Sequence, residues 1–280
     1  MHTLLVAVHG ILTRQTDPSW PDRLDAWMCR RDSGVKVLKK EYAAGPLPRW
    51  NCLMRNPRLA RALEAEIVLF LEGRQGPLPP TWLVAHSNGA VIALRVTHRL
   101  IARGYRVGGL ILTGAACPAD VRANGVWNWC QRGQLGAAIA YCSPDDRVLA
   151  GDARALRGPW RRVRAWLWAW LIWPYGCLGR TGWTGLDAGA GAPPEALGGP
   201  RACRGAVLFT RWFRGGHSAY FAPDRIEQTF EQIYRDIGSS RAVWGQGPAM
   251  PDSRPAPRQG LLVSRPLVGL SANRRDFELP

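Results

Sequence analysis

Lysine is almost absent from this chain of 280 residues, and only Lys36, Lys39 and Lys40 occur among its 37 basic residues. The other 34 are arginines, which give a formal net charge of +16 and are scattered along the chain instead of lying in one block. A nucleic-acid-binding surface is expected to gather its positive charge on one face or in one run. The distribution therefore argues against nucleic acid as a partner.

The chain also lacks the residue spacings of metal sites. Its seven cysteines include no C-x-x-C pair, and its five histidines form no H-E-x-x-H pattern. Zinc sites in proteins are usually built from such closely spaced ligands. We therefore expect neither a metal nor a cofactor, and we expect the cysteines to be reduced and mostly buried as small apolar side chains.

Long apolar runs are missing as well. The stretch 165–179 carries no charge, but Pro174 and Gly176 interrupt it, and it is shorter than the roughly 20 residues of a membrane-spanning helix. The apolar segment His2–Val8 is too short for the central region of a secretion signal. A cytoplasmic protein is the simplest expectation.

What the chain does contain is an alternation of short apolar runs and helical patterns. Its 46% hydrophobic content suffices for one sizeable core. Strands with near-continuous apolar sequence are typical of a parallel sheet that is covered on both faces. The expected strands are 3–8, 35–38, 82–85, 109–113, 137–142 and 206–210, and the expected helices are 21–31, 56–71, 90–103 and 223–237.

Two details of these helices can be predicted. Asn56 is expected to cap the second helix, with Pro57 at its first position and Gly73 after its end. On the third helix Arg95, Arg99 and Arg103 follow one another at a spacing of four residues, which predicts a solvated face.

The segment Trp82–Ala93 organises the rest of the chain. An apolar run is followed directly by His86-Ser87-Asn88-Gly89 and then by a helical pattern, so Ser87 falls in a sharp turn between a strand and a helix. Small residues at Ala85 and Gly89 allow the close backbone approach that such a turn requires. The backbone N–H groups that open the helix, beginning with Asn88, would favour negative charge beside Ser87.

These residues resemble the G-x-S-x-G elbow of serine hydrolases with the α/β-hydrolase fold, except that Ala85 replaces the first glycine. The resemblance covers about residues 3–237. It implies a mostly parallel central sheet flanked by helices on both faces, reduced at the N-terminus, with Ser87 as the nucleophile. It also implies that the loop after His9-Gly10 supplies an oxyanion donor, so that the N–H groups of Ile11 and Asn88 together form the oxyanion hole.

The same resemblance assigns the acid and the base of a catalytic triad. His217, on a glycine loop after the last strand, would be the base. Asp146, in the turn after strand 137–142, would be the acid, with Asp145 as the close alternative and Asp120 as a third candidate. The order serine, aspartate, histidine is the order that this fold uses.

Two regions do not fit the alternation. Residues 155–200, which contain many tryptophans and then a segment rich in glycine, alanine and proline, are expected to form an insertion before the last strand. Arginines precede the tryptophans, so the insertion could contact a membrane surface, cover the substrate, or simply pack on the domain. Residues 1–237 would then form the hydrolase domain, and residues 238–280 a largely disordered tail rich in proline and arginine.

The expected activity is hydrolysis of a carboxylic ester or a similar acyl bond through an acyl-enzyme, with a small acyl compound as the substrate. Two alternatives stay open at this point. One is an acyltransferase or peptidase that uses the same triad, and the other is a basic binding module whose hydrolase site has degenerated. The residues do not define the acyl group, the leaving group or the oligomeric state.

Overall fold

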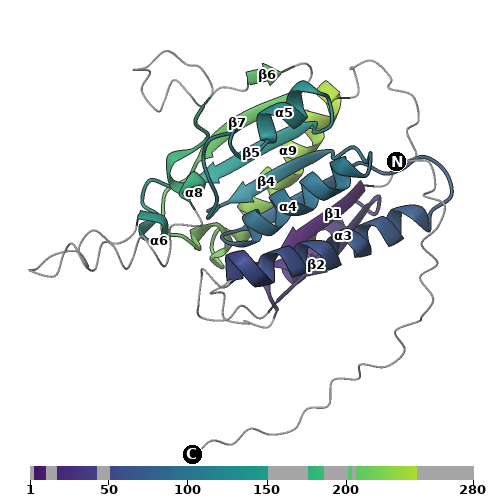
Figure 1. Ribbon diagram of the computed structural model, residues 1–280. Helices are drawn as coiled ribbons and strands as arrows, with labels where there is room; N and C mark the ends of the chain where they lie inside the picture. The colour runs from purple at the N-terminus through teal and green to yellow at the C-terminus, as the bar shows by residue number, and fades with distance from the viewer. Residues whose placement is uncertain are drawn as a thin grey trace, which may run out of the picture.

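The computed structural model describes residues 3–10, 18–42, 51–150, 176–185, 201–203 and 206–244. Its main strands and helices alternate along the chain, as Figure 1 shows. The strands are β1 (Thr3–Val8), β2 (Val35–Lys40), β3 (Thr81–His86), β4 (Gly109–Thr113), β5 (Ala137–Cys142), β6 (Arg201–Cys203) and β7 (Ala206–Trp212). The helices are α1 (Trp20–Arg31), α3 (Asn56–Glu72), α4 (Gly89–Ala102), α5 (Val126–Gln131), α6 (Arg147–Ala150), α8 (Leu178–Thr181) and α9 (Ile226–Trp244), with a π-helical turn η1 (Asn51–Arg55) and a 3-10 turn η3 (Ala219–Phe221).

The seven strands form one sheet in the order β2-β1-β3-β4-β5-β7-β6. Six of them run parallel to their neighbours, and the short edge strand β6 is antiparallel to β7. This is the α/β class with a mostly parallel sheet that the sequence predicts. Because the strands are parallel, the loops that follow β3, β5 and β7 all leave from the same edge of the sheet.

Helices cover both faces of the sheet, as expected. Side chains alternate along each strand, so that Leu4 and Val6 of β1 face α3 and α4, while Leu5 and Ala7 face α1 and α9. Figure 1 shows α3, α4 and α5 in front of the sheet and α9 behind it. The sheet is therefore buried on both sides, which explains its near-continuous apolar strands.

The last helix is longer than predicted. The sequence suggests an end near Ile237, because Gly238 follows, but α9 continues to Trp244. Its buried face persists beyond the glycine, since Ser240 is buried and the Arg241 guanidinium contacts the Thr3 hydroxyl of β1. Packing outweighs the cost of about 1 kcal/mol of a glycine inside a helix. The rest of the predicted tail, residues 245–280, lies outside the described residues.

The beginning of α3 also differs from the prediction. Asn56 does not cap the helix, because the π-helical turn η1 runs directly into it and Arg55 occupies the capping position without a side-chain hydrogen bond. The Asn56 side chain is instead fully buried and donates a hydrogen bond of 2.8 Å to Asn88 in the turn after β3. Gly73 does follow the helix, as predicted.

Arg99 of α4 and Arg103, which directly follows this helix, are not simply solvated. Both guanidinium groups pair with the Glu64 carboxylate of α3, whose side chain is only 2% exposed. A buried carboxylate requires such partners, because removing an unpaired charge from water is costly. The predicted arginine face therefore links the two helices that cover one side of the sheet.

The described part of the predicted insertion belongs to the core. Residues 176–185 include α8, and Gly179 donates to the Ala115 carbonyl and accepts from Ser143, so this segment joins the loops after β4 and β5. Trp183 is buried in the same core as the sheet. The insertion is therefore not a separate lid over this part of its length. The tryptophans at positions 160, 166, 168, 170 and 173 lie outside the described residues.

Within the described ranges, none of the helices is long and apolar enough to cross a membrane.

Four of the six cysteines whose side chains are described are buried, as predicted: Cys52, Cys117, Cys130 and Cys142. Burial raises the pKa of the Cys142 thiol to about 12, so this side chain behaves as a small apolar group.

Candidate active site

Ser87 occupies a strained turn between β3 and α4. Its φ of 54° makes it the one non-glycine residue with positive φ in the described part of the chain. Hydrogen bonds to the end of β4 and to the loop after it hold this conformation: the Ser87 N–H donates to the Thr113 carbonyl over 3.1 Å, and the Ser87 carbonyl accepts from the Ala116 N–H over 3.1 Å. Strained backbone of this kind costs about 1–3 kcal/mol and is typical of functional sites. The turn therefore has the geometry of a nucleophile elbow.

Two glycines make room for this turn. A Cβ atom at Gly89 would lie 2.5 Å from the His9 carbonyl oxygen and 2.6 Å from that of Val8, so the helix begins directly against the end of β1. A Cβ atom at Gly10 would lie 2.9 Å from the Ser87 Cβ. The close approach predicted at Gly89 is present, although its partner is the end of β1 and not the elbow strand. The His9-Gly10 loop also borders Ser87, as predicted.

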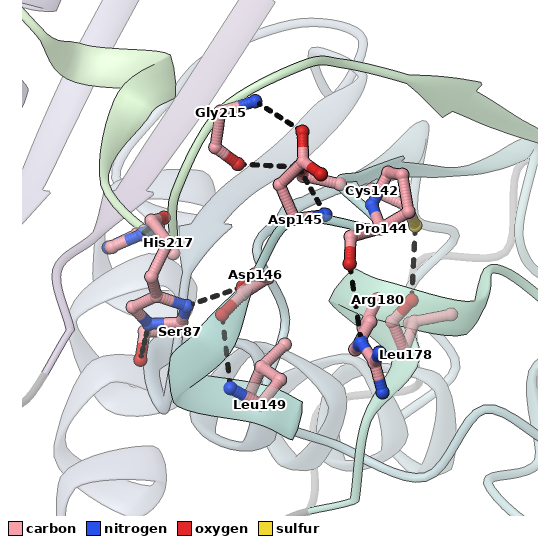
Figure 2. Close-up of polar contacts among 12 residues, drawn as sticks. Ser87, Cys142, Pro144, Asp145, Asp146, Leu149, Leu178, Arg180, Gly215 and His217 are labelled. Atoms are coloured by element: carbon pink, nitrogen blue, oxygen red, sulfur yellow. Dashed lines mark hydrogen bonds and ion pairs between the residues drawn. The ribbon is translucent and has the colours of Figure 1, made fainter. Parts of the chain in front are cut away.

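The three predicted triad residues meet at the carboxyl edge of the sheet. The His217 Nε2 atom lies 2.8 Å from the Ser87 hydroxyl oxygen, and the His217 Nδ1 atom lies 2.7 Å from Asp146 Oδ2. Figure 2 shows the imidazole bridging the two side chains. These residues follow β3, β5 and β7, so strands that are far apart in the sequence bring the three groups together. Asp146 is fully buried, whereas the His217 side chain is 11% exposed.

The structure distinguishes among the three candidate acids. Asp146 points at His217, and its other oxygen accepts a hydrogen bond of 3.0 Å from the Leu149 N–H. Asp145 points to the other side, where it accepts from Gly215 over 3.3 Å (Figure 2). Asp120 accepts from the Arg122 N–H over 2.8 Å in its own turn. Only Asp146 of the three contacts the imidazole.

The loop that carries His217 is held at several points. The Ser143 hydroxyl donates to the Gly215 carbonyl, and Gly215 has a φ of 128°, a conformation that favours glycine. On the other side, the His86 Nε2 atom lies 3.0 Å from the His217 carbonyl oxygen. The loop is therefore tied both to the turn after β5 and to the end of β3.

Backbone donors for an oxyanion lie directly after Ser87. Asn88 and Gly89 open α4, and their N–H groups have no backbone acceptor within the described residues. Unpaired N–H groups at a helix N-terminus favour negative charge. The second predicted donor, Ile11, lies outside the described residues, although the neighbouring Gly10 lies so near Ser87 that an added Cβ would be 2.9 Å from the Ser87 Cβ.

Asn88 is fixed by a buried cluster of amides. Its side chain exchanges two hydrogen bonds with Asn56, of 2.8 and 3.1 Å, and donates a third, of 2.9 Å, to the Tyr42 hydroxyl. Both asparagines are at most 1% exposed. These contacts hold the residue that directly follows Ser87, and they connect it to the first turn of α3.

Sequence reasoning missed the contacts of His86, Asn56 and Tyr42 with the site. His86 lies next to Ser87 in the sequence, but nothing in the elbow pattern indicates what an imidazole contacts there. Asn56 matches the sequence pattern of a helix cap, and that local pattern does not indicate its contact with Asn88. No pattern distinguishes Tyr42 from an ordinary loop residue.

The comparisons with known proteins reveal only distant likenesses. No family model and no curated protein matches the chain. Among solved structures, an uncharacterized protein from Bacillus cereus is 12% identical, with a TM-score of 0.46 over 86% of this chain and 60% of the other. RedJ, a thioesterase from the prodiginine pathway of Streptomyces coelicolor, is 14% identical, with a TM-score of 0.43 over 84% and 86%. Est1E from Butyrivibrio proteoclasticus is 10% identical, with a TM-score of 0.43 over 86% and 89%.

The architecture itself defines the class. A parallel sheet covered on both faces carries a serine on a strained strand–turn–helix connection, with an aspartate and then a histidine on later loops of the same edge. This is the arrangement of the α/β-hydrolase fold.

Proposed function

We propose that this protein is a serine hydrolase that cleaves a carboxylic ester or a similar acyl bond through an acyl-enzyme intermediate. The observation that carries the proposal is the continuous chain of hydrogen bonds from Ser87 through His217 to Asp146, with lengths of 2.8 and 2.7 Å. A serine hydroxyl is a weak nucleophile by itself, and a hydrogen-bonded imidazole that is oriented by a carboxylate activates it.

In the proposed reaction, Ser87 Oγ forms a bond to the acyl carbon while its proton passes to His217 Nε2. The resulting tetrahedral intermediate collapses, the bond to the leaving group breaks, and His217 returns the proton to that group. Water then attacks the acyl-enzyme by the same route and frees the acid. Asp146 stays ionised throughout, because its role is to hold the Nδ1–H tautomer and to stabilise the imidazolium.

The negative charge on the acyl oxygen would be stabilised by the Asn88 N–H, which lies at the start of α4. We propose the Ile11 N–H as the second donor. In other enzymes the loss of one such donor costs about 2.7–4 kcal/mol of transition-state stabilisation. The contacts of Asn88 with Asn56 and Tyr42 support this role, because a preorganised donor need not reorient during the reaction.

An apolar acyl group is favoured by the side chains next to the triad. A small apolar cluster consists of the buried Cys52 and Ala116 with the partly buried Val91 and Leu149 packed against them, and Val91 also contacts the larger core. It adjoins the site at two points, because the Ala116 N–H bonds to the Ser87 carbonyl and the Leu149 N–H bonds to Asp146. Leu53 and Val148, the sequence neighbours of two cluster members, are 62% and 47% exposed.

A fluorophosphonate probe tests the nucleophile. The wild type should be labelled at Ser87, and Ser87→Ala should lose both the label and about four to six orders of magnitude of turnover, as triad deletions do elsewhere. Ser239→Ala is the matched control, because Ser239 lies exposed on α9 and should leave labelling unchanged. Labelling of Ser87→Ala at the wild-type rate would refute the assignment.

A series of p-nitrophenyl esters of increasing acyl length tests the substrate class. We expect kcat/KM to rise by up to about fourfold per added methylene, because burying one methylene contributes about 0.8 kcal/mol. A constant or falling series would contradict an apolar acyl site. Acyl transfer to an added alcohol or amine, or cleavage of a peptide, at a higher rate than ester hydrolysis would identify a transferase or a peptidase instead.

A further inference from the structure

His86 is the last residue of β3 and directly precedes Ser87. Side-chain alternation places it on the same face of the strand as Trp82 and Val84, the face that α1 and α9 cover. The residue is 2% exposed. Its ring centroid lies 5.0 Å from that of His217, and its ring packs edge-on against Phe221 at 5.4 Å.

The hydrogen bond of His86 fixes its tautomer. The His217 carbonyl oxygen can only accept, so the His86 Nε2 atom, 3.0 Å away, must carry the proton and donate it. Burial, together with the nearby His217, lowers the pKa of His86 to about 3. The ring is therefore neutral over the pH range in which most enzymes work, with a lone pair on Nδ1.

That second nitrogen is buried as well. No hydrogen-bond partner for the His86 Nδ1 atom is present among the described residues. The atom faces Gly10, where an added Cβ would lie 3.2 Å away. A leucine at this position would fill similar space without burying a polar nitrogen, so packing alone does not account for an imidazole here.

We propose that His86 is a positioning residue, which holds the backbone of His217 to the strand that carries Ser87 and so sets the distance between base and nucleophile. The inference rests on the function proposed above for these two residues. His217 follows Gly215 and Gly216, which restrain a loop poorly, and the two hydrogen bonds of Gly215 tie the loop to the turn that carries Asp145. The His86 bond restrains it on the Ser87 side.

The choice of a neutral donor also fits the reaction. His217 becomes positively charged when it takes the serine proton, and a second positive charge 5.0 Å away would oppose that step. A buried imidazole with a depressed pKa supplies a fixed N–H without such a charge.

Two substitutions separate positioning from packing. His86→Gln keeps an N–H donor, whereas His86→Met has a similar volume and no donor. We expect His86→Met to lower kcat by about 10²-fold, the usual cost of displacing a catalytic group by about 1 Å. Its KM should change by less than about threefold, because His86 is 2% exposed and offers almost no surface to a substrate. His86→Gln should recover most of the loss, and His98→Gln, at an exposed position on α4, should match the wild type.

All rates should be expressed per active site, counted by fluorophosphonate titration of Ser87. A wild-type kcat per site in His86→Met, or equal losses in the Gln and Met variants, would overturn the role of His86. Absence of Ser87 labelling in the wild type would overturn the proposed function instead, so the two failures can be told apart.

Nitrogen-15 NMR of the histidine side chains tests the same contact directly in the wild-type protein. We expect one neutral imidazole that carries its proton on Nε2 at pH 7 and exchanges that proton slowly, and that is missing from the spectrum of His86→Gln. A His86 ring that carries its proton on Nδ1, or that is charged at pH 7, would overturn the inference.

Discussion

Asp145 and Asp146 are neighbours in one turn, yet their side chains point to different partners. Asp146 is fully buried against the imidazole, while Asp145 accepts a hydrogen bond from the backbone of the histidine loop. The contact of Asp146 is proposed to keep the proton of the neutral imidazole on His217 Nδ1, whereas the contact of Asp145 helps to hold the loop. Two residues of the same type in one turn therefore have different chemical consequences.

Substitution of each aspartate by asparagine separates these consequences. Asp146→Asn should lower kcat by about 10⁴-fold, because an amide at this position stabilises the wrong imidazole tautomer, as the equivalent change does in another triad. Asp145→Asn keeps an oxygen acceptor for the Gly215 N–H and should change kcat by less than about tenfold. Steady-state kinetics on one ester measures both. A larger loss in Asp145→Asn than in Asp146→Asn would reverse the assignment of the acid.

At the scale of elements, the site depends on how closely α4 approaches the end of β1. The first residue of the helix is Gly89, and the atoms that its missing side chain would strike are backbone carbonyl oxygens. A backbone cannot move aside as a flexible side chain can, so this glycine is a steric requirement of the elbow. Gly238 differs, because a Cβ added there in α9 would meet nothing within 4 Å.

The two glycines should therefore respond oppositely to alanine. Gly89→Ala should lower the free energy of unfolding by about 1–3 kcal/mol through overpacking and should slow labelling of Ser87. Gly238→Ala should raise the free energy of unfolding by about 0.5–1 kcal/mol, because alanine loses less backbone entropy in a helix. Urea denaturation of the three proteins gives both values. A Gly89→Ala protein as stable as the wild type would contradict the close approach.

At the scale of the whole molecule, buried histidines make the unfolding equilibrium depend on pH. Burial lowers the pKa of both His9 and His86, in the latter case to about 3. The unfolded chain binds a proton at these positions once the pH falls below about 6.5, whereas the folded protein binds it only at a lower pH, near 3 for His86. Each buried histidine therefore makes its full contribution to the free energy of unfolding above pH 6.5. That contribution is lost as the pH falls toward the pKa of the histidine in the folded protein.

His86 alone should account for a loss of about 2 kcal/mol in the free energy of unfolding between pH 7 and pH 5, since one pH unit corresponds to about 1.4 kcal/mol. Because His9 is present in both proteins, comparison with His86→Gln isolates this share. Denaturant unfolding at the two pH values should show a smaller decrease for the variant. Equal decreases would mean that His86 is not buried as a neutral ring.

Much of the fold could be predicted from local sequence. The strands Gly109–Thr113 and Ala137–Cys142 have their predicted bounds, because short apolar runs end at turn residues there. The predicted end of α9 was wrong because packing against β1 overrides a local glycine signal. Asn56 was misassigned for a similar reason, since its buried contact with Asn88 lies 32 positions along the chain.

The sequence by itself determined the alternation of strands and helices, the small residues that the elbow needs, and the order of serine, aspartate and histidine, because each depends on short-range pattern or on chain order. Only the tertiary structure decided that Asp146 and not Asp145 contacts the imidazole, and that His86 binds the His217 carbonyl from 131 positions away. Such choices depend on directions and distances of about 3 Å between loops of separate strands, and no local pattern specifies those.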